Sequence, residues 1–290
     1  MEYGQLLKNS LKIAWERKYL WAFGFFAGVG MPNTRGVAVE EKLGDAWAWL
    51  TSNPGLLILV LVLAGILSLV FLVLQVVSQG GLIKSASAIE RGQPSSFELA
   101  LNAGLQSFWR VLGLELLLVV LLLAGMVAAI VPPVAMIAAG PAGLKVLGIV
   151  WIVLAILPFI AAVLGAALLW NYALRFVVID DRPIGRSLSL SWNCFKQCLS
   201  ESVILFAISL GFSIAITIAV VAALVVLAIP FIILGLVNPI LGLVPGLLVG
   251  IPVLVVAICV LGVFSSAYWT LGFLRLPCFK QAAPPGAPAA

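Results

Sequence analysis

Histidine is absent from this chain and charged residues are scarce, since Asp, Glu, Lys and Arg make up only 9% of its 290 residues. Without histidine, the chain lacks the commonest general base and the commonest metal ligand. Neither a phosphate-binding glycine loop nor a nucleophile elbow occurs in the sequence. The sequence therefore indicates no catalytic residue, no metal site and no cofactor, and it favours a protein that is not an enzyme.

The low charge also excludes a water-soluble surface, which needs about a quarter of its residues charged. Apolar residues make up 63% of the chain. The strict two-residue alternation of a membrane β-barrel is missing, whereas a transmembrane helix needs about 20 mostly apolar residues. Four stretches are long enough, the last of them for two spans: 54–83, 116–144, 146–174 and 202–274. We predict an all-α integral membrane protein.

A sixth transmembrane helix is predicted near the N-terminus, although its apolar stretch, residues 19–31, is short. Leu7, Leu11 and Trp15 are spaced four apart before it, so one long helix can lie in the headgroups and then enter the bilayer. The alternative is that residues 1–31 lie only on the membrane surface.

The polar turns after the second and fourth spans resemble each other. The second span ends at Lys84, and Glu90 and Arg91 follow; the fourth ends at Arg175, and Asp181 and Arg182 follow at the same spacing. An amphipathic pattern comes after each turn. Its apolar positions are Phe97, Leu101, Leu105 and Phe108 in one copy and Ile184, Leu188, Trp192 and Phe195 in the other.

These similarities predict a single membrane domain, residues 1–275, built from three repeats at roughly 1–91, 92–182 and 183–275. Each repeat would place a cytoplasmic amphipathic helix before a pair of spans, so that six transmembrane helices form three hairpins. The Pro- and Ala-rich tail, residues 276–290, is expected to be disordered.

The charged turns allow two interpretations. Arginines at helix ends reach anionic lipid headgroups, which predicts lipid or partner contacts for Arg91, Arg175, Arg182 and Arg186. The other interpretation is a substrate or partner site on the same surface. We expect the lipid bilayer as a partner and no nucleic acid.

Two polar residues within the spans are candidates for an intramembrane site. Glu115 lies beyond Arg110, where an ionisable group is costly unless it is paired or wetted. It either binds a cation, a proton or a substrate group, or it pairs with Arg110 or a neighbouring helix. Asn171 is expected to hydrogen-bond between helices. Cys194 and Cys198 are expected to be reduced thiols on the cytoplasmic side.

The segments LKIAWERKYLWAFGFFAG and ALRFVVIDDRPIGRSLSLSW, with six Gly- and Pro-rich spans, resemble a bacterial membrane-domain group. This group includes the domain attached to some glycerophosphodiester phosphodiesterases. In the fused proteins the hydrolase activity belongs to a separate soluble domain, and this sequence contains nothing like it. The resemblance implies a membrane module without catalytic residues of its own.

Three classes of function stay open. A membrane scaffold, or a lipid- or envelope-associated accessory protein, ranks first because it fits the basic surface helices and the absence of catalytic groups. A transporter or channel for a small solute would use Glu115 and the Pro-interrupted last spans. A membrane enzyme would need the two acid–Arg turns to act together on a lipid phosphate.

Basic residues predict the orientation in the cell membrane. All but three of the 16 Lys and Arg residues lie in segments 1–18, 84–110, 175–201 and 275–290. Basic segments stay cytoplasmic during insertion, so both termini should be cytoplasmic. Single cysteines introduced at residues 40 and 185 should therefore be labelled from opposite sides of the membrane. Labelling of both from the same side would contradict the six-span topology.

Overall fold

The computed structural model describes residues 2–29, 49 and 51–282, and every element in this part of the chain is a helix. The long helices are α4 (Pro54–Glu90), α5 (Phe97–Ala139), α6 (Ala142–Ile179), α8 (Leu199–Val237) and α9 (Pro239–Arg275). The short helices are α1 (Tyr3–Glu16), α2 (Leu20–Val29), α7 (Ile184–Gln197) and α10 (Pro277–Ala282). The five long helices are apolar enough to cross a membrane, which agrees with an all-α, multi-pass membrane protein.

The long helices exceed the thickness of a bilayer. They contain 37 to 43 residues, or about 55–65 Å at 1.5 Å per residue, whereas the hydrocarbon core of a bilayer is about 30 Å thick. Their outer parts expose large apolar side chains, and their inner parts are buried against one another. Each long helix therefore has two parts with different surroundings.

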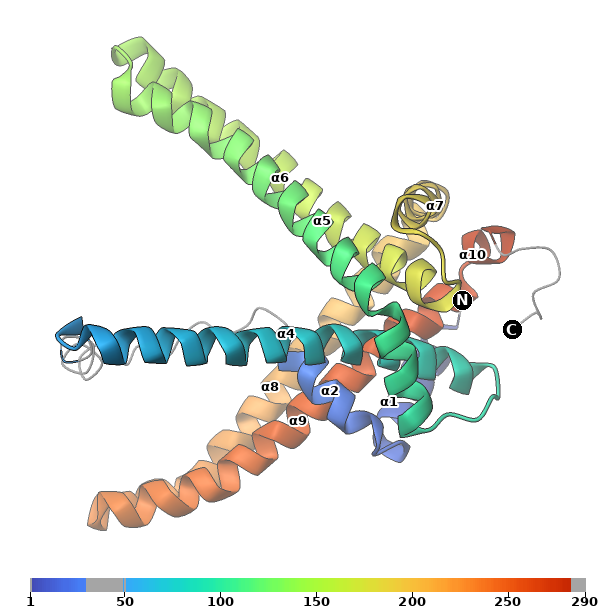
Figure 1. Cartoon of the computed structure of the whole chain (residues 1–290), viewed down its shortest axis with the longest axis vertical. Coiled ribbons are helices and arrows are strands. Elements are labelled where there is room, and N and C mark those ends of the chain that lie inside the picture. Colours follow the sequence, from blue (N-terminus) through green and yellow to red (C-terminus); the bar gives the residue numbers. More distant parts are fainter. Residues whose placement is uncertain (1, 30–48, 50, 283–290) are drawn as a thin grey trace.

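Figure 1 shows the outer parts as three arms that radiate from one centre: α4, the pair α5 and α6, and the pair α8 and α9. We define the arms as residues 56–72, 116–134, 144–164, 210–237 and 240–256. The hub is the centre, where residues 76–90, 100–114, 168–179 and 259–276 meet α1, α2, α7 and α10.

The core of the hub is aromatic. Phe273 of α9 packs against two rings of α6, with ring centroids 5.7 Å from Tyr172 and 4.9 Å from Phe176. The buried Tyr172 hydroxyl donates to Ser202 Oγ at 2.8 Å, and the buried Tyr268 hydroxyl donates to the Leu205 carbonyl at 3.1 Å. These bonds satisfy polar groups that would otherwise be costly to bury, and they join α6 and α9 to the start of α8.

The predicted sixth span is represented by α2, ten residues that pack against α4 and α9. Residues 30–48 lie outside the described part of the chain, so six spans, the three hairpins and the repeats stay predictions. The last two long helices meet at Asn238 in a helical hairpin. At the C-terminus, Pro277–Ala282 form α10, so the expectation of disorder from residue 276 is wrong for these residues. Residues 283–290 lie outside the described chain.

The three arms are held together by close helix contacts in the hub. Small residues allow backbones in membrane proteins to approach closely. Gly80 and Gly81 of α4 lie against Ala100 and Gly104 of α5, and Gly24 of α2 lies against Gly262 of α9. The hub therefore leaves no room for side chains at these crossings.

Gly104→Ala should disrupt the contact between α4 and α5. Its Cβ would overlap the Val77 carbonyl oxygen and lie 2.9 Å from Val77 Cγ1. Because a backbone atom cannot move aside without bending α4, we expect a loss of about 1–3 kcal/mol, measured as a lower melting temperature in detergent. The control is Gly125→Ala on the arm part of α5, where a Cβ meets no described atom within 4 Å. Equal melting temperatures for the two variants would contradict this packing.

Candidate functional site

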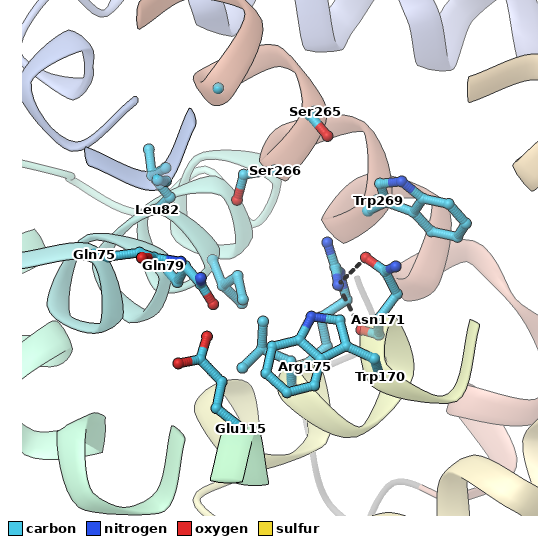
Figure 2. A pocket seen from close by; sticks show the side chains of 14 residues that line it. Gln75, Gln79, Leu82, Glu115, Trp170, Asn171, Arg175, Ser265, Ser266 and Trp269 are labelled. Atoms are coloured by element: carbon cyan, nitrogen blue, oxygen red, sulfur yellow. Dashed lines mark hydrogen bonds between the residues drawn. The ribbon is translucent and has the colours of Figure 1, made fainter. Parts of the chain in front are cut away.

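A polar cavity of about 290 Å³ lies where the arms join the hub. Helices from all three arms line it, as Figure 2 shows. Its polar and aromatic residues are Gln75 and Gln79 of α4, Glu115 of α5, Trp170, Asn171 and Arg175 of α6, and Ser265, Ser266 and Trp269 of α9. Such a concentration of polar groups stands out in a chain that is 63% apolar.

Arg175 is the buried cation of this cavity, since only 2% of the residue is exposed. One Nη donates to the main-chain oxygen and to Oδ1 of Asn171, one turn earlier in α6. Its Nε has no hydrogen-bond partner within the described chain. An enclosed guanidinium without an anionic partner costs several kcal/mol. The site therefore contains a buried donor that the described chain leaves unsatisfied.

Glu115 supplies the opposite charge. Its carboxylate and the side chain of Gln79 of α4 point toward each other in Figure 2. The Oε1 atom of Gln79 has no hydrogen-bond partner among the described residues. In the same part of the chain, no ion pair joins Glu115 to Arg175 or to Arg110, because Arg110 pairs with Asp181 at 3.0 Å. The cavity thus contains one charge of each sign without an ionic partner.

An apolar groove of about 470 Å³ lies next to the cavity, between the arm parts of α4, α5 and α6. Gln75, Glu115 and Trp170 line both spaces, so the cavity and the groove are neighbours at these residues. The rest of the groove is lined by Leu72, Leu118, Val119, Leu122, Val163, Ala166 and Ala167. The site is therefore polar at its hub end and apolar at the end that follows the membrane-facing arms.

Ion pairs hold the charged turns at the edge of the hub. Asp181, which follows α6, lies 3.6 Å from Lys84 of α4 and 3.0 Å from Arg110 of α5. Glu90 at the end of α4 pairs with Arg275 at the end of α9, at 2.7 Å. These contacts join the C-terminal ends of α4, α6 and α9.

Asp180 forms a more enclosed pair beside these contacts. It lies 3.2 Å from Arg182, and each of the two side chains is only 15% exposed. Burial raises the pKa of the Asp180 carboxyl above its ordinary value, while the Arg182 guanidinium acts in the opposite direction.

The four arginines predicted at the lipid surface have three different surroundings. Arg91 and Arg186 are exposed, and their contact with headgroups stays a prediction. Arg182 pairs with Asp180. Arg175 lies inside the protein and not at its surface, because the last turns of α6 are in the centre of the hub.

Asn171 differs from its prediction as well. Its Nδ2 donates to the Ala167 carbonyl at 2.9 Å and its Oδ1 accepts from Arg175, so its hydrogen bonds stay within α6 and do not join two helices. The sequence does not predict Ser265, Ser266 and Trp269 as parts of the site. For Gln75 with Gln79, and for Asn171 with Arg175, the sequence does carry a signal. Each pair is spaced four residues apart, which puts both side chains on one helix face.

The cysteines also differ from their prediction. Cys194 of α7 forms a disulfide with Cys278 of α10, because these two helices pack together, whereas Cys198 and Cys259 are free and buried. The expectation of a reduced thiol is therefore wrong for Cys194 in this structure. Among the described residues, no group of three or more Cys, Asp or Glu side chains could hold a metal ion.

Comparison with known proteins found no match to this chain among protein-family models, curated proteins or solved structures. The resemblance to the membrane domain attached to glycerophosphodiester phosphodiesterases therefore stays a prediction. The features that define this protein are its apolar helices, its hub and its cavity.

Substitutions at Asp181 test the turn. The residue has a φ of +53°, a conformation that asparagine tolerates and that a β-branched residue does not. Because the side chain is 61% exposed, loss of its ion pairs in Asp181→Asn should cost up to about 1 kcal/mol. Asp181→Val should cost roughly 1–2 kcal/mol more. Melting temperatures measure the stability loss of both variants. Similar melting temperatures for Asp181→Asn and Asp181→Val would show that the positive φ at this position does not restrict the side chain, and would contradict the prediction.

Proposed function

We propose that the protein is a lipid-associated membrane scaffold that holds one amphiphilic lipid at the junction of the hub and the arms. The observation that carries this proposal is that Gln75, Glu115 and Trp170 line both the polar cavity and the apolar groove. A lipid has the same division, since its headgroup is polar and its acyl chains are apolar. The Arg175 donor would bind the headgroup, and the groove would hold a chain.

The depth of the cavity supports this proposal. The arm parts of α4, α5, α6 and α9 contain about 17 to 21 residues each, a length of roughly 25–31 Å that matches the hydrocarbon core of a bilayer, whereas the arm part of α8, residues 210–237, is longer. The cavity lies at the inner ends of these parts and therefore near the level of the headgroups. The proposal puts the hub on the cytoplasmic side, as the basic residues predict.

The dimensions are also appropriate. Ligand sites are typically about 300–1,000 Å³ in volume and combine mostly apolar walls with a few polar groups. The cavity of about 290 Å³ and the groove of about 470 Å³ together fall within this range. The groove alone has no charged group other than Glu115, so a headgroup would sit in the cavity.

A transporter of a small polar solute is the second candidate. It is favoured by one observation, the position of Glu115 between the cavity and the groove, because an ionisable residue at membrane depth commonly marks a solute or proton pathway. In that case the cavity would bind a solute that has no acyl chain.

Native mass spectrometry of the purified full-length protein tests lipid binding. We expect one tightly retained phospholipid per chain. Ala167→Phe should reduce its occupancy because the ring fills the groove that Ala167 lines. Ala161→Phe is the matched control, because Ala161 is exposed on the same helix and does not line the groove.

Arg175→Gln should also reduce the occupancy, by roughly tenfold in affinity for the loss of a charged hydrogen bond. Arg17→Gln, at an exposed position outside the cavity, should leave it unchanged. The proposal would be contradicted if neither Ala167→Phe in the groove nor Arg175→Gln in the cavity reduced the retained lipid, or if the wild-type protein retained none.

A further inference from the structure

We propose that the lipid in this site is zwitterionic, with a phosphate group and a primary ammonium group in its headgroup, as in phosphatidylethanolamine. This inference rests on the proposed function, because it names the chemical class of the molecule that the cavity binds. It starts from the two charges, Arg175 and Glu115, that line one cavity without pairing to each other.

Two unpaired opposite charges in one cavity need a ligand that carries both signs. Arg175 is buried and Glu115 is half-buried, and a buried ion without an ionic partner costs several kcal/mol. A purely anionic headgroup would neutralise Arg175 but would bring a second negative charge beside Glu115. A zwitterionic headgroup neutralises both residues at once.

The hydrogen-bonding groups assign each end of the headgroup. The Nε of Arg175 is an unused donor, and guanidinium groups bind phosphate oxygens through charge-assisted hydrogen bonds. On the α4 and α5 side, the Glu115 carboxylate and the unused Oε1 of Gln79 are acceptors. An acceptor pair requires hydrogen-bond donors, and a primary ammonium group has three, together with a positive charge that a hydroxyl group lacks.

The requirement for a cationic group that can donate hydrogen bonds separates two zwitterionic lipids. The quaternary ammonium of phosphatidylcholine has no N–H and would leave Gln79 Oε1 without a partner, whereas Trp170 and Trp269 could still contact its methyl groups. We therefore expect phosphatidylethanolamine to bind more tightly than phosphatidylcholine with the same acyl chains.

The test is a competition among three phospholipids with identical acyl chains, added in equal amounts to the purified full-length protein and read by native mass spectrometry. The wild-type protein should retain phosphatidylethanolamine about tenfold more than phosphatidylglycerol or phosphatidylcholine. Glu115→Gln should still retain lipid but should lose its preference over phosphatidylglycerol. Glu98→Gln, an exposed position on the same helix, should keep the wild-type preference.

The outcomes separate this inference from the proposed function. Retention of phosphatidylglycerol or phosphatidylcholine at or above the level of phosphatidylethanolamine would overturn the headgroup assignment and leave lipid binding intact. If Glu115→Gln kept the wild-type preference for phosphatidylethanolamine over phosphatidylglycerol, the headgroup assignment would likewise be overturned and lipid binding would stand. Retention of none of the three lipids would overturn both. Excess soluble phosphoethanolamine should not displace the lipid, and its binding in place of lipid would identify a soluble solute as the ligand.

Discussion

The length of the helices is the constraint on which the rest of this structure depends. A helix of 37 residues or more cannot lie entirely in a hydrocarbon core about 30 Å thick. The outer parts can expose Leu, Ile and Val to lipid, but the inner parts must be buried against other protein. This requirement explains why glycines gather at the crossings of α4 with α5 and of α2 with α9. It also explains why ion pairs gather at the C-terminal ends of α4, α6 and α9.

The candidate site lies at the boundary between these two surroundings. On the hub side, helices from three arms converge closely enough to bury Arg175. On the arm side they separate, and an apolar groove remains between α4, α5 and α6. A cavity that is polar on one side and apolar on the other follows from this arrangement. Our proposal puts this boundary at the level of the headgroups, which is why we favour a lipid over a soluble ligand.

Much of the fold could be predicted from the sequence, because five apolar helices follow directly from residue composition and length. The site could be predicted only in part. Glu115 was recognisable, since an ionisable residue beyond the start of a long apolar run is costly. The sequence predicts Arg175 at the lipid surface, and this prediction is wrong because local sequence does not reveal that α6 ends in the centre of the hub. The Cys194–Cys278 disulfide and Ser265 depend on contacts between distant segments, and no local pattern reports such contacts.

The most direct measurement of the central claim is an experimental structure of the full-length protein in nanodiscs that contain phosphatidylethanolamine. Our account predicts a lipid phosphate within about 3 Å of the Arg175 guanidinium, with an acyl chain along Leu118 and Leu122. It also predicts that the headgroup layer of the nanodisc lies level with Glu115. A structure in which Arg175 contacts only protein and the groove is closed by side chains would contradict it.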